Sequence, residues 1–372
     1  MIPFLDLRRE YRRLESELAP VVQNVLASGH YIQGNEVEKF EEQWAAYCGV
    51  NRAVMVASGT DALTLALEAS GAITPGASDE VITSAHGSPY TAMAVVRAGA
   101  RPVFADIDPE TWLVTPATFE RALTPHTRAF IPVHLYGLPC DMAGILDLAR
   151  KHGLFVLEDA CQAHGAQCRT GEWERVGGLG GAGAFSFYPT KNLGCFGDAG
   201  IIVSGDDELI ERARVLSSGG QQIRNSAVVP GYNSRGDELQ AAILNCKLRH
   251  LDEWNERRRA LATVYRERLR LPGLQYQTVP AGREHVYHLF VIRHRQRDRL
   301  RAHLREKGFE TMIHYPVALH RQPAFADPAQ PRLPEAERAA EEVLSLPLQP
   351  DLSAAEVENV ADAVNDFASV TA

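Results

Sequence analysis

The stretch AFSFYPTKNLGCFGDAGIIVSG (184–205) contains two short apolar runs, and the loop between them carries Lys191. Five similar runs precede it: AVMVAS (53–58), EVITSA (80–85), RPVFADI (101–107), AFIPVHLY (129–136) and LFVLEDA (154–160). Near-continuous apolar runs of this length are typical of strands that helices cover on both faces. DALTLALEAS (61–70) and DMAGILDLARKHG (141–153) repeat apolar residues at helical spacing between the runs. The sequence therefore predicts an α/β domain in which helices enclose a central, mostly parallel sheet.

The pattern changes after about residue 236, where one long, charged helical stretch (237–269) leads away from the sheet. Beyond it, HLFVIRHR (288–295) and ETMIHYP (310–316) indicate strands, whereas 297–308 and 353–368 have helical patterns. A chain of 372 residues also exceeds what one core usually holds. We predict a large domain over residues 1–240, with an N-terminal segment at 1–30, and a linking helix plus a small α/β domain over 241–372.

Charge and composition exclude several classes of partner. The formal net charge of −9 argues against binding to nucleic acid or to an anionic membrane. No apolar run reaches the ~18–20 residues of a membrane span, and the charged N-terminus lacks an apolar signal core. The six cysteines form no CxxC pair, and the histidines lack metal-ligand spacing. We expect a cytoplasmic protein with reduced thiols and no metal.

Lysine is scarce, and one lysine stands apart from the others. Lys39, Lys151, Lys247 and Lys307 lie in charged helical patterns, which favours solvated helix faces for all four. Lys191 instead follows a strand and precedes Gly194 and Gly197 in the sequence. An amine at a strand end can be desolvated and aimed by the scaffold, as Schiff-base chemistry requires. Lys191 is therefore a candidate nucleophile.

Asp159 lies at the end of another predicted strand, in LFVLEDACQAHGA (154–166). In open α/β sheets ligands gather outside the carboxyl ends of the strands, so Asp159 and Lys191 can converge on one crevice. A carboxylate that keeps a pyridine nitrogen protonated creates the electron sink of pyridoxal phosphate (PLP). If Asp159 stood alone, a helix N-cap would be the favoured explanation for it.

Ser58, Gly59, Thr60 and Asp61 form a small-residue turn between a predicted strand and a predicted helix. Such a turn offers free backbone N–H groups and the positive end of the helix dipole to a phosphate. Helix capping alone would also favour these residue types. Ser186 could supply a further hydroxyl donor.

A second glycine motif does not predict a nucleotide site. Gly178, Gly180 and Gly183 match GxGxxG. They precede a strand, however, whereas a dinucleotide fingerprint connects a strand to a helix. A dehydrogenase is therefore disfavoured.

Eight motifs in order resemble the DegT/DnrJ/StrS nucleotide-sugar aminotransferases, which have the aspartate-aminotransferase fold (fold type I). They are PFLDLRREY (3–11), GHYIQGNEVEKFE (29–41), SGTDAL (58–63), PVHLYG (132–137), EDACQAHGA (158–166), FSFYPTKNLGCFGDAG (185–200), GYNSRGDELQAAIL (231–244) and IHYPVALHRQPAF (313–325). The resemblance implies a three-layer αβα large domain that binds PLP and a smaller α/β C-terminal domain.

The resemblance also implies a role for individual residues. Lys191 would form the Schiff base, Asp159 would pair with the pyridine nitrogen, and Gln162 would lie against the ring. The phosphate would be held by Gly59, Thr60 and Ser186, and by Asn233 from the second subunit of a homodimer with shared active sites. The substrate-side residues implied are Tyr31, Tyr188, His314 and Tyr315.

The chain departs from the family pattern at Gly87-Ser88, where the family usually has threonine followed by an aromatic residue that stacks on the pyridine ring. Ser88 therefore removes the usual stacking platform. His86 or Tyr90 could supply a flat face instead, although Tyr90 could equally be a packing residue.

The resemblance implies transfer of an amino group from glutamate to carbon 3 of a dTDP-3-keto-6-deoxyhexose, in deoxyaminosugar biosynthesis for antibiotics or cell-surface sugars. A 4-keto sugar or an amino-cyclitol remains an alternative, as does a PLP-binding regulatory protein that does not transaminate. A related sugar dehydratase has histidine in place of the lysine, so Lys191 argues against that activity.

Overall fold

The computed structural model describes residues 2–74, 76–327 and 330–371. A seven-stranded sheet with the order β1-β9-β8-β5-β4-β2-β3 forms its centre. The strands are β1 (Arg52–Val56), β2 (Glu80–Ser84), β3 (Arg101–Ala105), β4 (Thr127–Ile131), β5 (Phe155–Asp159), β8 (Ala182–Ser186) and β9 (Gly200–Ser204). Each apolar run quoted above contributes one of them. Only β9 runs against its neighbours, so the sheet is mostly parallel, as predicted.

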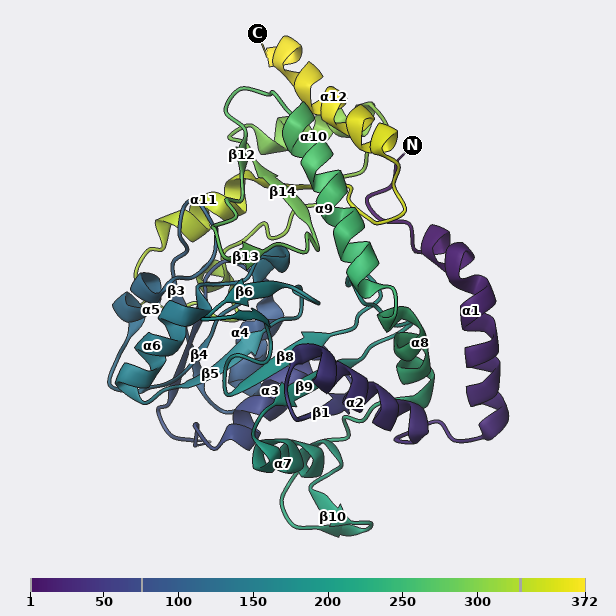
Figure 1. The fold of residues 1–372 in the computed structure, drawn as a ribbon. Helices are drawn as coiled ribbons and strands as arrows, with labels where there is room; N and C mark the ends of the chain where they lie inside the picture. Colours follow the sequence, from purple (N-terminus) through teal and green to yellow (C-terminus); the bar gives the residue numbers. More distant parts are fainter. Residues whose placement is uncertain (1, 75, 328–329, 372) are drawn as a thin grey trace.

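Helices cover both faces of this sheet (Figure 1). They are α2 (Asn35–Cys48), α3 (Gly59–Ser70), α4 (Pro89–Arg97), α5 (Pro116–Ala122), α6 (Met142–His152) and α7 (Asp207–Ser217). Successive strand residues alternate between two hydrophobic cores: in β9, Ile201 and Val203 join one core and Ile202 joins the other. Burial of both faces explains why the strands are almost continuously apolar.

The long helix predicted at 237–269 is wrong, because the chain forms two helices, α8 (Glu238–Leu248) and α9 (Leu251–Arg268). The two helices are separated by Arg249 and His250, because each helix packs against different neighbouring helices. Helix α8 packs on α1 (Leu7–Ser28) and α2, whereas α9 packs on α12 (Ala354–Thr371).

The smaller lobe at the top of Figure 1 has its own sheet and core. Its elements are β12 (Gln275–Tyr276), β14 (Phe290–Arg293), β15 (Val343–Leu346), α10 (Arg297–Glu306) and α11 (Pro334–Glu342). The strand predicted at 310–316 is wrong, because only Met312 pairs there, in an isolated bridge to Ser345. The Tyr315 hydroxyl accepts from Gln162, which lies outside the sheet, and Pro316 has no N–H to donate.

Short elements complete the fold. They are the sheet of β6 (Gln167–Arg169), β7 (Trp173–Arg175) and β13 (Arg283–Glu284), the hairpin of β10 (Gln221–Ile223) and β11 (Ser226–Ala227), and two 3-10 turns, Leu135–Gly137 and Leu319–Arg321. Among the described residues, no helix combines the length and apolarity that crossing a membrane would require.

Candidate active site

The carboxyl ends of β1, β5 and β8 meet at one edge of the central sheet. Asp159 ends β5 and Ser186 ends β8, while Ser58 follows β1. The antiparallel strand β9 begins at the same edge, because Gly200 lies opposite both Val56 and Ser186. The loop that carries Lys191 must therefore return to this edge, and the topology brings the predicted residues together.

The amine of Lys191 is held in a desolvated position. Burial lowers the pKa of Lys191, while Cys161 and the Asp159 carboxylate partly oppose that effect. Within the described part of the chain, its Nζ has no hydrogen-bond or ion-pair partner, whereas its backbone N–H donates to the Tyr188 carbonyl at 2.9 Å. A lowered pKa raises the fraction of neutral amine, so the geometry suits a nucleophile.

Asp159 is anchored through both carboxylate oxygens. Thr91 Oγ1, in α4, donates to Oδ2 at 2.6 Å, and the Cys161 N–H donates to Oδ1 at 3.2 Å. Both Asp159 and Thr91 are buried. The two hydrogen bonds fix the orientation of the Asp159 carboxylate. The sequence did not single out Thr91, because its contact with Asp159 exists only in the folded chain, between residues that are 68 positions apart.

The N-terminus of α3 presents unused donors beside Ser186. Ser58 caps the Asp61 N–H at 3.1 Å, and the first intrahelical bond comes from Ala62. The amides of Gly59 and Thr60 have no acceptor among the described residues, as is usual for a first turn. A Cβ on Gly59 would lie 2.6 Å from Ser186 Cβ, so glycine lets the two segments approach closely. This arrangement suits a phosphate group.

Gln162 is fixed at both ends of its amide. Its Oε1 accepts from the Tyr136 N–H at 2.8 Å, and its Nε2 donates to the Tyr315 hydroxyl at 2.9 Å. Burial raises the pKa of Tyr315 to about 12, although its hydrogen bonds with Gln162 and Ser88 partly oppose the rise. Tyr315 therefore links the small residue at position 88 to Gln162.

Three histidines near the site are neutral and engaged with protein groups. His86 Nε2 lies 2.8 Å from the Tyr136 hydroxyl, and burial lowers the pKa of His86 to about 3. His164 Nε2 donates to the Ser186 carbonyl at 2.9 Å, and burial, followed by Lys191, lowers its pKa to about 3. The same two causes lower the pKa of His314 to about 4. The contact of His86 with Tyr136 gives no support to a stacking role for His86.

The glycine motif at 178–183 binds one of the protein's own carboxylates. Glu158, fully buried, accepts from the N–H groups of Gly177, Leu179 and Gly180 at 2.7–2.8 Å. His134 Nε2 lies 3.1 Å from the same carboxylate. The loop has the anion-binding capacity that GxGxxG suggests, but Glu158 occupies it, immediately before Asp159.

Several of the predicted residues lie on the surface of the single chain. Tyr31, Tyr90, Tyr188 and Asn233 are exposed. The chain nevertheless fixes Asn233 locally, since it bridges to Ser218. The structure thus places these side chains outside the buried cluster around Lys191.

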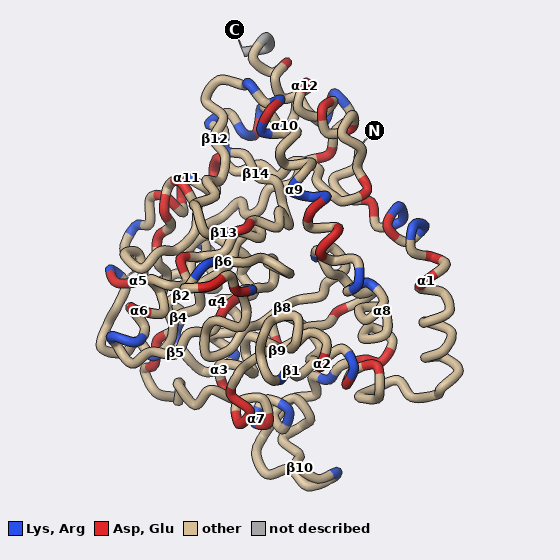
Figure 2. The backbone as a smooth tube through the Cα atoms, in the orientation of Figure 1, with Lys and Arg blue, Asp and Glu red and all other residues tan. Residues whose placement is uncertain are grey.

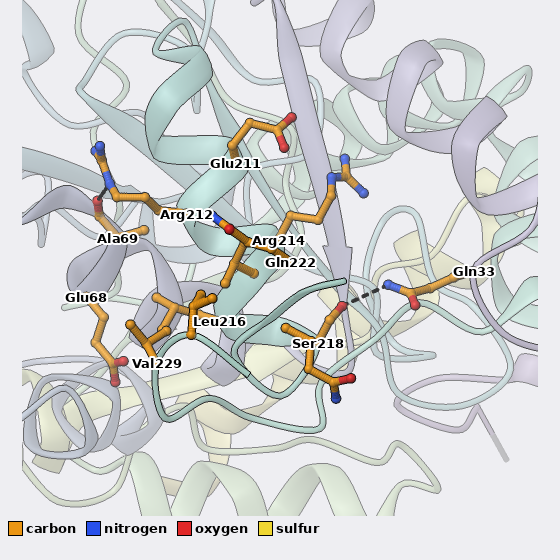
Figure 3. Close-up of a pocket in the computed structure, with 13 residues that line it drawn as sticks. Gln33, Glu68, Ala69, Glu211, Arg212, Arg214, Leu216, Ser218, Gln222 and Val229 are labelled. Atoms are coloured by element: carbon orange, nitrogen blue, oxygen red, sulfur yellow. Dashed lines mark hydrogen bonds between the residues drawn. The ribbon is translucent and has the colours of Figure 1, made fainter. Parts of the chain in front are cut away.

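A cavity of about 660 Å³ lies away from Lys191, between α3, α7 and the β10–β11 hairpin. Figure 3 shows Leu216 and Val229 in its wall, with Gln33 donating to Ser218 Oγ at 3.2 Å. We call this cavity the hairpin groove.

The cluster fits the chemistry of PLP. That cofactor needs an amine for its aldehyde, a carboxylate for its ring nitrogen and donors for its phosphate. Lys191, Asp159 and the α3 N-terminus with Ser186 provide these groups at one sheet edge.

Two solved structures match this chain over nearly its whole length. The crystal structure of S. venezuelae DesV in complex with a ketimine intermediate matches with a TM-score of 0.94 and 47% identity, covering 99% of this chain and 98% of that one. The structure of NtdA from Bacillus subtilis with bound cofactor PMP matches with a TM-score of 0.90 and 32% identity, covering 99% and 85%.

Sequence relatives extend over nearly the whole chain. The dTDP-3-amino-3,4,6-trideoxy-alpha-D-glucose transaminase of Streptomyces venezuelae is 47% identical over 370 residues, covering 99% of this chain and 96% of the relative. The pleiotropic regulatory protein of Geobacillus stearothermophilus is 45% identical over 371 residues, covering 98% of each. Residues 12–365 match the DegT/DnrJ/EryC1/StrS aminotransferase family, and the chain belongs to it. It is a PLP-dependent aminotransferase.

Proposed function

We propose that this aminotransferase moves an amino group from glutamate to carbon 3 of a dTDP-3-keto-6-deoxyhexose, with Lys191 as the residue that binds PLP. The observation that carries the proposal is the desolvated amine of Lys191, which has no partner among the described residues, near the anchored Asp159 carboxylate. The name of the S. venezuelae transaminase supports a dTDP-linked substrate aminated at carbon 3.

Each protein group has a distinct role in this proposal. Asp159 would keep the ring nitrogen protonated, and Gln162 would lie against one face of the ring. Gly59, Thr60 and Ser186 donate to the phosphate. Ser88, with its hydrogen bond to Tyr315, lies where the family has a stacking aromatic residue. We also propose that His86 lies beside the cofactor, where its hydrogen bond with the Tyr136 hydroxyl holds that tyrosine in place.

Proton transfer then falls to Lys191. PLP, when bound, supplies the electron sink that weakens the bond to the donor's α-hydrogen. With cofactor and glutamate bound, the desolvated amine of Lys191 would accept a proton at one carbon and return it at another. The reverse half-reaction places the amino group on the keto sugar. We propose Tyr31, Tyr188, His314 and Tyr315 as the residues that contact the sugar nucleotide.

We also propose a homodimer in which Asn233 reaches the phosphate of the partner's site. Figure 2 shows little charge on the lower part of α1 and along the β10 hairpin, and residues 18–35 contain no Asp, Glu, Lys or Arg. Ile223 and Val228 of the hairpin region and Leu26 of α1 are exposed apolar side chains. Such surface favours a protein interface, and the hairpin groove lies beside it.

We also propose a division into two domains and a cellular location. We place the large PLP-binding domain at 1–240 and the linking helix and small domain at 241–372, although α8 straddles this boundary. A separate core built from α9, α10, α12, β14 and β15 supports the division. We also propose a cytoplasmic location, which the six free cysteines support.

The proposal is tested by incubating the PLP-loaded protein with glutamate and a panel of dTDP-3-keto and dTDP-4-keto sugars, followed by mass analysis. Amination of 3-keto sugars is expected. Reaction with 4-keto sugars alone would overturn the regiochemistry. A PLP-loaded protein that reacts with no amino donor would overturn transamination and favour the regulatory alternative.

Shared sites are tested by mixing two inactive variants, Lys191→Ala and Asn233→Ala. A mixed dimer would contain one site with both native residues, so activity should return. Failure to regain activity, with mixed dimers present by mass, would contradict the sharing of Asn233.

A further inference from the structure

Lys247 contradicts the expectation of a solvated helix face. Lys247, in α8, is only 1% exposed, whereas Lys39, Lys151 and Lys307 are exposed, as predicted. Burying an ammonium group is costly unless partners replace its water. The partners of Lys247 therefore indicate what it does.

The ammonium of Lys247 binds one group on each of two separate segments. It donates to the backbone carbonyl of Gly194 and forms an ion pair with Glu10 of α1. Its Nζ also lies 5.4 Å from the ring centroid of Phe196 and 5.9 Å from that of Trp254. Aromatic faces attract cations, so the pocket is built for a positive charge.

Gly194 and Phe196 belong to the active-site loop, which we define as residues 189–198. This loop has no helix or strand, so its shape depends on contacts with other elements. A Cβ on Gly194 would lie 2.5 Å from the Pro189 carbonyl oxygen, so the two sides of the loop are closely packed around Lys191. A shift of Gly194 would therefore be transmitted to the segment that carries Lys191.

Two side chains on one face of helix α8 form hydrogen bonds with the active-site loop. Gln240 Oε1 accepts from the Phe196 N–H at 2.9 Å, and Lys247 lies seven residues further along, two turns away on the same face. Lys247 also joins the loop to α1 through Glu10, which is in the first turn of that helix. The three segments meet at this ammonium group, beside an edge-on contact between the Tyr11 ring of α1 and the Phe196 ring of the loop, with centroids 6.2 Å apart.

We propose that Lys247 is a positioning residue, which holds the active-site loop in the shape that presents Lys191 to the cofactor and couples that shape to α1. The proposal rests on the proposed role of Lys191. Without the Lys247 charge, the buried Gly194 carbonyl loses its partner and Glu10 loses its counter-ion, so the loop can relax.

The test compares Lys247→Met, Lys247→Arg and Glu10→Gln with wild type. Lys151→Met is the matched control, because Lys151 is exposed and pairs with Glu120 on the surface, at 3.3 Å. Two properties are measured on folded protein: the dissociation constant for PLP, and the pH midpoint of the visible absorbance of bound PLP. Unfolding in urea is followed separately.

Loss of one charged hydrogen bond predicts a ~10-fold or larger rise in the PLP dissociation constant for Lys247→Met. The absorbance midpoint should shift, Glu10→Gln should act in the same direction, and Lys247→Arg should recover part of the loss. The effects of Lys247→Met and Glu10→Gln should be non-additive, since the two residues interact. Lys151→Met should match wild type.

Wild-type PLP affinity and absorbance midpoint in both Lys247→Met and Glu10→Gln would overturn the inference, even if both unfold more readily in urea. If Lys247→Met does not fold, Glu10→Gln alone decides the question in the same way. Failure of wild type to take up PLP would instead refute the proposed function and remove the basis of the inference.

Discussion

Replacing Thr91 by valine removes one hydrogen bond from Asp159 and leaves the shape of the side chain almost unchanged. Thr91 is 2% exposed, and its Oγ1 donates to Asp159 Oδ2 at 2.6 Å. A buried hydrogen bond to a charged group contributes about 1.5–3 kcal/mol. Of the two donors Thr91 Oγ1 and the Cys161 N–H, the Asp159 carboxylate would keep only the second. It could then rotate away from the ring nitrogen.

If that energy is expressed in the transition state, the rate of the half-reaction with glutamate should fall about 10- to 100-fold. Stopped-flow absorbance of the bound cofactor measures this rate directly. Thr91→Ser keeps the hydroxyl and should stay close to wild type.

Thr83→Val is the matched control. Thr83 is also fully buried, but its Oγ1 donates to the Ile131 carbonyl, at 2.9 Å, instead of to a site residue. It should lower the free energy of unfolding by about 1 kcal/mol without changing the half-reaction. A wild-type rate in Thr91→Val, or an equal rate loss in Thr83→Val, would refute the role assigned to Thr91.

Three further predictions concern stability and cofactor affinity. Because burial lowers the pKa of Lys191, the folded apoprotein binds fewer protons than the unfolded chain between that pKa and the ordinary lysine value of ~10.4. The free energy of unfolding should therefore rise with pH in this window. In urea unfolding, Lys191→Met should remove this pH dependence and be more stable than wild type at neutral pH. An unchanged pH dependence would contradict the desolvation of Lys191. Glu158→Gln should lower the free energy of unfolding in urea by about 3 kcal/mol or more, since an amide cannot accept from all the N–H groups that face Glu158. The control Glu172→Gln, at an exposed position, should leave it unchanged. A loss under about 1 kcal/mol in Glu158→Gln would contradict this role. Gly59→Ala places a Cβ 2.6 Å from Ser186 Cβ and should raise the PLP dissociation constant ~10-fold in equilibrium dialysis. In the control Gly171→Ala, the new Cβ meets no atom within 4 Å and the dissociation constant should not change. Equal PLP affinities in the two variants would contradict the phosphate site.

The sequence predicted the layers of the large domain because its strands are buried on both faces and are therefore apolar throughout. It did not predict the break between α8 and α9, because neither glycine nor proline marks Arg249 or His250. The break follows from which helices α8 and α9 pack against. The segment 310–316 has the composition of a strand, yet only Met312 forms a bridge, because the segment instead brings Tyr315 to Gln162.

The candidate site shows the same limit. Lys191 and Asp159 could be selected because strand ends of a parallel sheet share one edge. Thr91 and Lys247 could not, since their importance lies in contacts between segments that are distant along the chain. Lys247 has the charged helical surroundings of a surface residue, and only its burial reveals the difference.

The central claim is that Lys191 bonds covalently to PLP. Reduction of the PLP-loaded protein with borohydride, followed by proteolysis and mass spectrometry, would locate that bond. The pyridoxyl phosphate mass should be found on the peptide that contains Lys191, and prior incubation with glutamate should remove it. A label on another lysine, or none at all on the PLP-loaded protein, would contradict the account.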